Sequence, residues 1–402
     1  MTQTVLLGDV VDISSSKRIF YSEYTDEGVP FYRSKEIIEK AAGNPVSTPL
    51  HISNERFIEI SEKFGAPKAG DILLTSVGTL GIPYLVQEDD HFYFKDGNLT
   101  WFRKYSDSLL PEYLYYWLSS PVGKAELENH TIGSTQRALT IQGLKKVRIP
   151  LLPTREQREV VRILESINHK IEVNGRMNET LEQIGQTLFK HYFIDNPESK
   201  TWPVTELGNY IELVNGASYK SSELKPSANA LVTLKSFSRG GGFRRDGFKE
   251  FIGTIKDPQV VTDGDIVVAH TDVTQKAEIA GVPALVTGTG RYEKVGISMD
   301  VVKVNSTDDN ISSAFLYFLL RSRTFQDHKM GYISGTTVLH LNKKCIPSYK
   351  LRIPTDSSVL KAISDSFVSI VKSIAQNEDQ ADSLTELRYS LLPRLMSGKI
   401  KV

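Results

Sequence analysis

Two long stretches of the chain place apolar residues along a single helical face. From Thr154 to about Phe193 there is no proline, and most gaps between apolar residues are three or four positions, the spacing of one side of a helix. Thr154, with Gln157 three positions later, predicts a capped helix start. The second stretch begins near Asp356 and is expected to end at Pro393. We therefore predict two long amphipathic helices.

Shorter apolar runs, separated by Gly, Pro, Asn and Asp, fill the chain before each predicted helix, as in strand-rich domains. A short apolar helix is expected near Glu112–Leu118, with a counterpart near Ser312–Arg321. The predicted strands of the first half are Val29–Tyr32, Ile72–Leu74, Tyr84–Val86, Phe92–Phe94 and Leu99–Phe102.

Short motifs recur in the same order at an offset near 200 residues. GDILL at Gly70–Leu74 recurs as GDIVV at Gly264–Val268, and VRIP at Val147–Pro150 recurs as LRIP at Leu351–Pro354. This period is far longer than the roughly 20–50 residues of a solenoid repeat. The chain therefore contains two whole domains of one fold.

The predicted fold is α+β, with two homologous strand-rich domains at residues 1–153 and 198–354 and helical regions at 154–197 and 355–402. A helix of about 35–40 residues is about 50–60 Å long, longer than a 150-residue domain is wide. We expect the helices to form an antiparallel coiled coil that joins and separates the domains with pseudo-two-fold symmetry. The alternative is that each helix packs only on its own domain.

Composition narrows the class of protein. The 402 residues contain a single cysteine, Cys345, which excludes an internal disulfide framework and a multi-cysteine zinc site. We expect Cys345 to be a buried small side chain. No basic leader begins the chain, and its apolar stretches are shorter than the roughly 20 residues that span a bilayer. We expect a cytoplasmic protein without a membrane partner.

Motifs for catalysis are missing from the sequence. It has no Walker loop, no glycine-rich cofactor loop after a strand, and no Asn-Pro-Pro-aromatic site. Glu223-Leu224-Lys225 has the form of a nuclease half-site, but a solvated loop is the favoured interpretation. The eight histidines show no metal-ligand spacing. We expect no catalytic centre and no metal site.

Net charge is zero for the whole chain, which argues against a broad nucleic-acid binder. The zero hides a difference between the domains. Residues 1–153 carry 16 basic and 19 acidic side chains, a net −3, whereas residues 201–354 carry 19 and 15, a net +4. Basic residues gather with polar and aromatic ones in loops, and these are the side chains that hold phosphates and read base edges in DNA. A solvated loop is the favoured interpretation of any single cluster, but related clusters flank the repeated motifs in both halves, which weakens that interpretation.

Four stretches carry a resemblance to a known family: VPFYRSKEI at Val29–Ile37, GDILLTSVGTLGIPYLV at Gly70–Val86, LLPEYLYYWL at Leu109–Leu118, and GSTQRALTIQGLKKVRIPLLPTREQREVVRIL at Gly133–Leu164. With them, the chain resembles the specificity subunit of type I restriction-modification systems over essentially its whole length. The second half keeps Gly264–Val268 and Leu351–Pro354 but lacks Glu-Gln at its helix start.

The resemblance implies two target recognition domains, each reading one half of a split site in double-stranded DNA, with the coiled coil setting the spacer. It also implies two DNA-methyltransferase subunits, which methylate adenine, and motor-endonuclease subunits that restrict DNA. No cofactor is then expected on this chain; S-adenosylmethionine, ATP and Mg²⁺ belong to the partners. Two alternatives stay open: a stand-alone duplicated DNA-processing enzyme, and a coiled-coil scaffold that does not bind DNA.

Candidate DNA contacts follow from the basic and polar loops. Base-edge contacts are expected from Ser76, Thr79, Gln136, Arg137, Thr271, Thr274, Gln275, Thr336 and Thr337, and phosphate contacts from Lys17, Arg18, Arg239, Arg244 and Arg245. Further contacts are expected from Arg33, Lys35, Lys145, Lys220, Lys235, Lys276 and Lys343. Because Gly133–Thr135 and Gly335–Thr337 recur in both halves, they are equally explained as framework.

Overall fold

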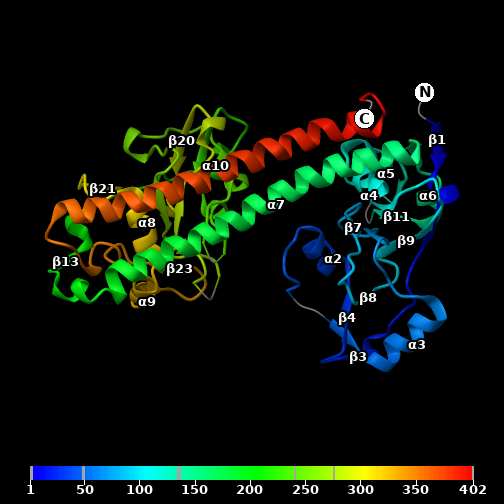
Figure 1. The fold of residues 1–402 in the computed structure, drawn as a ribbon, viewed down its shortest axis with the longest axis horizontal. Coiled ribbons are helices and arrows are strands. Elements are labelled where there is room, and N and C mark those ends of the chain that lie inside the picture. The colour runs from blue at the N-terminus through cyan, green and yellow to red at the C-terminus, as the bar shows by residue number, and fades with distance from the viewer. Residues whose placement is uncertain (1–2, 48–49, 134–136, 240, 275–276, 401–402) are drawn as a thin grey trace. The chain divides into compact units, whose positions relative to one another are not determined.

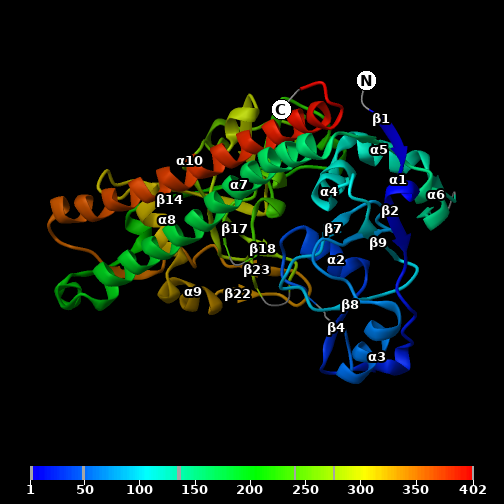
Figure 2. The same ribbon diagram turned by 45° about the vertical axis from the view of Figure 1, so that its right-hand side comes forward.

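Two compact units make up the computed structural model, Met1–Ile171 with Ser383–Val402, and Glu172–Asp382. The structure describes residues 3–47, 50–133, 137–239, 241–274 and 277–400. Both long helices, α7 (Thr154–Lys190) and α10 (Ser357–Met396), pass from one unit into the other. Figures 1 and 2 show the course of the chain from two sides.

Among its described residues, the strand-rich part of the first unit holds two four-stranded sheets and two small strand pairs. The sheet orders are β2-β9-β6-β7 and β3-β5-β4-β8, and the pairs are β1-β12 and β10-β11. The strands are β1 (Gln3–Leu6), β2 (Val11–Ser14), β3 (Tyr24–Thr25), β4 (Val29–Tyr32), β5 (Leu50–Ile52), β6 (Ile72–Thr75), β7 (Pro83–Leu85), β8 (Tyr93–Phe94), β9 (Leu99–Tyr105), β10 (Thr131–Ile132), β11 (Ala138–Leu139) and β12 (Arg148–Leu151). The short helices are α1 (Leu7–Val10), α2 (Ser34–Ala41), α3 (Asn54–Phe64), α4 (Pro111–Ser119), α5 (Pro121–Asn129) and α6 (Ile141–Lys145).

The second unit repeats this plan. Its sheets are β14-β21-β17-β19, β16-β15-β20 and β18-β23-β22, with the pair β13-β24. The strands are β13 (Val204–Glu206), β14 (Ile211–Asn215), β15 (Asn229–Val232), β16 (Lys249–Glu250), β17 (Ile266–Ala269), β18 (Thr271–Asp272), β19 (Pro283–Leu285), β20 (Lys294–Ile297), β21 (Val301–Ser306), β22 (Ile333–Ser334), β23 (Leu339–Leu341) and β24 (Lys350–Arg352). The short helices are α8 (Ser313–Arg321) and α9 (Arg323–Met330).

The duplication is visible in the topology of each domain taken by itself. The order β2-β9-β6-β7 corresponds to β14-β21-β17-β19, and the parallel pair β4–β8 corresponds to β15–β20. Helices α4 and α5 correspond to α8 and α9. The predicted α+β class, with two similar strand-rich domains and two long helices, is confirmed.

The domains differ mainly between their first and central strands. The first domain has α2 and α3 there, which the apolar pattern did not predict, whereas the second has short 3-10 turns. Ser53 caps α3, since its hydroxyl accepts the Arg56 N–H at 3.2 Å, a bond that stabilises a helix start. Each domain therefore attaches its own segment to a shared sheet.

Each domain packs its main sheet and a short helix against the long helices. In the first unit, Ile72, Phe102 and Trp117 share a core with Val160 and Leu164 of α7. In the second unit, Ile266, Val302, Phe315 and Phe318 share a core with Phe367 of α10. The buried stripe of the long helices is therefore part of the domain cores.

The long helices pair antiparallel within each unit. In the first unit, Val160 and Leu164 of α7 share a core with Leu392 and Leu395 of α10. In both views α10 runs beside α7 within each unit (Figures 1 and 2).

In the second unit two asparagines of α7 bond to α10. Asn174 Nδ2 donates to the Asn377 carbonyl at 3.2 Å and to Gln380 Oε1 at 2.9 Å, and Asn178 Nδ2 donates to the Ile374 carbonyl at 3.3 Å. Polar side chains inside such a seam fix register, and the bonds of Asn174 and Asn178 suit them to that role.

The helix ends depart from the sequence prediction in two places. Gln157 does not close a capping box: its amide is buried and accepts the Leu110 N–H, while it donates to the Ser108 and Leu152 carbonyls. It pins α7 to its own domain. Pro393 lies inside α10, which ends three residues later at Met396. A proline inside a helix removes one hydrogen bond and strains the preceding turn. The helix continues past Pro393 for less than one turn.

Candidate nucleic-acid interface

In the first domain, strand pairing brings the predicted loop at residues 76–79 next to the β10–β11 hairpin. The Leu139 N–H donates to the Ser76 carbonyl at 2.9 Å, and Val77 forms a bridge with Ala138. Thr79 and Arg137 are exposed there, and Arg137 pairs with Glu128. Two predicted loops, 60 residues apart in the sequence, therefore share one surface. Gln136 lies outside the described residues.

Ser76 itself is a correction. Its side chain is buried and bonds to the Leu74 carbonyl at 3.1 Å and to Thr100 Oγ1 at 2.6 Å. A hydroxyl with both partners inside the domain is not available to a base edge, so the candidate contacts of this loop reduce to the exposed residues.

The second domain builds the equivalent surface with three strands. Thr271 of β18 pairs with His340 of β23, which also pairs with Ser334 of β22. The turn between β22 and β23 presents Thr336 and Thr337 to solvent. The Thr271 hydroxyl donates to Asp300 at 2.9 Å.

Thr274 is half-buried, and its N–H donates to Asp272 at 2.6 Å. This bond leads the loop away from β18. Gln275 and Lys276 fall outside the described residues.

The backbone bonds that hold these two surfaces are the same. The Ser76 N–H donates to the Asn98 carbonyl, and the equivalent His270 N–H donates to the Asp300 carbonyl. The Leu139 N–H donates to the Ser76 carbonyl, as the Leu341 N–H does to that of His270. We call this set of bonds the repeated framework. It fixes the loops at one place in each domain while their side chains differ.

His270 was not predicted as a candidate. Burial lowers its pKa, with Lys343 and His340 adding to the shift, and its Nε2 atom has no hydrogen-bond partner among the described residues. His270 thus lies next to β23 through the bond from Leu341 to its carbonyl, with His340 and the predicted Lys343 nearby. Its place follows from alignment with Ser76 in the repeated motif, which was the available signal.

The remaining predicted cations occupy several settings. Most are exposed, including Lys17, Arg18, Lys35, Lys220, Lys235, Arg239, Arg244 and Lys343. Arg18 pairs with Asp96, Arg239 with Glu278 and Arg244 with Asp246. Two have clear local roles: Arg33 pairs with Glu36 at the start of α2, and Lys145 is half-buried in α6. Surface ion pairs are weak, so the exposed members stay available to phosphates.

Arg245 is a second correction. It was expected to hold a phosphate, but its guanidinium reaches Glu378, Asp379 and Asp382 of α10 at 3.1, 2.9 and 2.6 Å. Its Nε donates to Thr287, whose hydroxyl donates to Glu378 at 2.7 Å. Burial raises the pKa of Glu378, which Arg245 and Thr287 partly counteract. This cluster ties the second domain to α10 and turns the Arg245 guanidinium toward carboxylates of its own unit.

Two other expectations concern chemistry. Cys345 is buried, as predicted, and burial raises the pKa of its thiol to about 12, which makes it a poor nucleophile. Glu223 accepts the Lys220 N–H at 2.6 Å in a 3-10 turn, which gives it a structural role. Over the described ranges, no three His, Cys, Asp or Glu side chains gather as metal ligands would. None of the helices there is both long and apolar enough to span a bilayer.

Comparison with known proteins agrees with the resemblance seen in the sequence. The family model for the type I restriction modification DNA specificity domain matches residues 2–183. The type I restriction enzyme MjaIX specificity subunit of Methanocaldococcus jannaschii is 26% identical over 393 residues, covering 89% of this chain and 87% of the relative. The chain is therefore similar to type I specificity subunits, by the domain match in its first half and by likeness to this relative along most of its length.

Two further proteins are similar to this chain. A Haemophilus influenzae chain that bears the name of a type I restriction enzyme specificity subunit is 33% identical over 167 residues, which cover 41% of this chain and 40% of the relative. The crystal structure of the type I restriction-modification S subunit from M. genitalium matches 98% of this chain and 96% of its own, with a TM-score of 0.56 and 15% identity. That likeness shows the specificity-subunit fold.

Proposed function

We propose that this chain selects the DNA sequence on which a type I restriction-modification complex acts. Each domain reads one half of a bipartite site in double-stranded DNA, and the paired helices set the spacer between the halves. The observation that carries the proposal is the repeated framework. It holds exposed polar loops at the same place in each domain, with Thr79 and Arg137 in one and Thr336 and Thr337 in the other.

The chemistry belongs to partner subunits in this proposal. Two methyltransferase subunits dock on the helices and methylate adenine with S-adenosylmethionine, and motor-endonuclease subunits add ATP- and Mg²⁺-dependent restriction in the cytoplasm. The chain itself contributes recognition and placement and is not a catalyst. This division is supported by the similarity of the chain to type I restriction enzyme specificity subunits.

Genome-wide mapping of methylated adenines tests the proposal. Cells that carry the methyltransferase subunits are compared with and without this chain. We expect a bipartite methylated motif only when the chain is present. Methylation that is unchanged by its removal, or methyl transfer by the purified chain alone, would contradict the proposal.

Double substitutions in each domain test whether the two domains read their half-sites independently. We expect Thr336→Ala with Thr337→Ala to relax one half of the motif, and Thr79→Ala with Arg137→Ala to relax the other. A base contact contributes about 1–3 kcal/mol of discrimination, so off-motif methylation should rise roughly 5- to 150-fold at the affected half only. Relaxation of both halves by one pair would show that these loops do not read sequence independently.

A further inference from the structure

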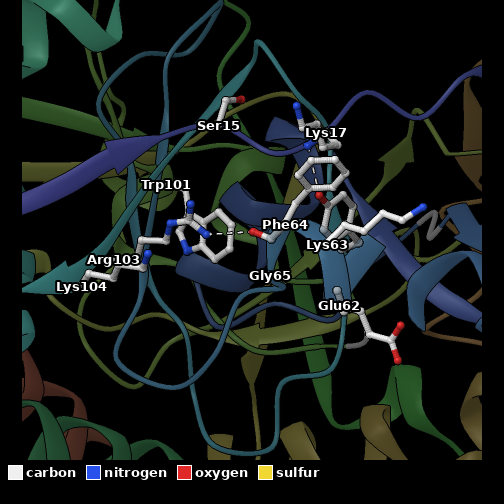
Figure 3. Close-up of a pocket in the computed structure, with 11 residues that line it drawn as sticks. Ser15, Lys17, Glu62, Lys63, Phe64, Gly65, Trp101, Arg103 and Lys104 are labelled. Atoms are coloured by element: carbon white, nitrogen blue, oxygen red, sulfur yellow. Dashed lines mark hydrogen bonds between the residues drawn. The ribbon is translucent and has the colours of Figure 1, made fainter. Parts of the chain in front are cut away.

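A pocket of about 550 Å³ opens in the first domain. Of the predicted DNA-contact residues, Lys17 is the one that lines it. The pocket lies where β9 meets the end of α3 and the start of the loop that follows β2 (Figure 3). Its lining combines basic and aromatic side chains: Lys17, Lys63, Arg103 and Lys104 with Phe64, Tyr93 and Trp101. We call it the basic pocket. Since α3 has no counterpart in the second domain, the basic pocket belongs to the first domain's own segment.

Positive charge is concentrated there although the domain as a whole is acidic. Four cations line the pocket against one carboxylate, Glu62, in a domain whose net charge is −3. Lys63 pairs with Glu59, and Arg103 with Asp12. Within the described ranges, neither Lys17 nor Lys104 has a carboxylate at ion-pair distance. Two ammonium groups are thus left for an anion from outside.

The backbone directs one of these cations by a strained turn. Lys104 has φ of 53°, a left-handed conformation that is uncommon for a residue other than glycine. It is the extra residue of a bulge, because Val11 pairs with Tyr105 while Asp12 pairs with Arg103. Bulges of this kind re-aim a side chain and gather near functional sites. Glycine would fit this position with less strain, so the fold itself does not require a lysine there. The positive charge of Lys104 is what the lysine adds.

Arg103 and the aromatic rings form a rigid wall. The Arg103 guanidinium lies 4.1 Å from the Trp101 ring centre, and its Nη1 donates to the Phe64 carbonyl at 3.0 Å. On the other side, Lys17 Nζ lies 4.4 Å from the Phe64 ring centre, and the Lys17 N–H donates to the Tyr93 hydroxyl at 3.0 Å. Figure 3 shows Arg103 and Lys17 on opposite sides of Phe64. The wall holds the cations in place, which reduces the entropy lost when an anion binds.

We propose that the basic pocket binds a phosphodiester of the DNA backbone beside the half-site read by the first domain. The proposal rests on the proposed function. The pocket adjoins the reading loop through the start of β9: the Ser15 hydroxyl, at the pocket edge, donates to the Leu99 carbonyl at 3.4 Å, and the Ser76 N–H donates to the Asn98 carbonyl at 2.8 Å. The start of β9 thus supports both the basic pocket and the loop at residues 76–79. Lys17, Lys63 and Lys104 bind phosphate as point charges and read no base.

The test uses the full chain assembled with its methyltransferase subunits and a duplex carrying the mapped motif. The variants are Lys17→Gln, Lys104→Gly and their combination, with Lys124→Gln as the control. Lys124 is exposed on α5, and its substitution removes the same charge elsewhere in the domain. We expect each pocket variant to weaken DNA binding about fivefold near physiological salt and to reduce the slope of log affinity against log salt by about one. The preference for motif over scrambled DNA should not change.

Lys104→Gly also separates binding from folding. Because it relieves the positive φ, its melting temperature should equal or exceed that of the parent chain while its DNA binding falls. If pocket variants and the Lys124→Gln control bind DNA alike, the proposal is overturned.

A second arm separates DNA from a free nucleotide. The same variants are titrated with 5′-AMP. Loss of AMP binding in the pocket variants with unchanged DNA affinity would assign the pocket to a free nucleotide and overturn the proposal. A parent complex that does not distinguish motif from scrambled DNA would instead defeat the proposed function.

Discussion

Single residues explain why basic side chains alone do not mark a DNA surface. Arg244 and Arg245 are neighbours in the sequence, yet Arg244 is exposed beside Asp246 whereas Arg245 is half-buried against three carboxylates of α10. Sequence patterns cannot separate them, because the acidic partners lie more than 130 positions away. The same holds for Ser76, whose buried partner Thr100 comes from a neighbouring strand.

Arg245→Gln should destabilise the second domain. The Arg245 side chain is 10% exposed and its carboxylate partners are partly exposed, so leaving these charges without a partner should cost about 1–3 kcal/mol. We expect a lower urea midpoint for the second domain, measured by fluorescence or hydrogen exchange. Arg244→Gln is the matched control and should cost less than about 0.5 kcal/mol, since its pair is exposed. Equal effects of the two variants would show that the cluster does not hold the domain to α10.

Elements were more predictable than sites. The helical periodicity located α7 and α10, and the apolar runs located β4, β6 and β9, because burial of one face imposes a period on the sequence. Two features of the first domain were not predictable. Helix α3 is short and largely polar, and Ile60 is its one buried apolar residue. The bulge at Lys104 depends on pairing between strands some 90 residues apart. The basic pocket needs both, so no local pattern could reveal it.

Asn174 is expected to stabilise the helix pair in the second unit. Its amide is only 1% exposed and donates two bonds to α10. Asn174→Ala leaves Gln380 Oε1 without this donor and should cost about 1–2 kcal/mol. Hydrogen exchange of α7 amides near residue 178 should speed up accordingly. Thr180→Ala, at an exposed position of the same helix, is the control. Unchanged exchange in Asn174→Ala would mean that apolar contacts alone hold the pair.

The whole molecule offers a test of the spacer. The boundary between the units crosses α7 after Ile171 and α10 after Asp382. Inserting one heptad at both places lengthens each helix by about 10 Å, which corresponds to about 3 base pairs of DNA at roughly 3.4 Å each. We expect the methylated motif to keep both half-sites and gain about 3 base pairs between them. An insertion in α7 alone is the control and should disrupt helix pairing. Altered half-sites would show that spacing and reading are not separate.

The repeated framework has a consequence for how such a protein changes over generations. Its bonds join backbone N–H and carbonyl groups, and every residue type except proline supplies both groups. Substitution at Val77, Thr271, Thr336 or Thr337 therefore leaves the bonds intact. New side chains can be tried at these positions with little loss of folded protein. The recognised bases can therefore change while the duplicated scaffold stays folded. The two domains can diverge from each other in sequence without losing their common fold.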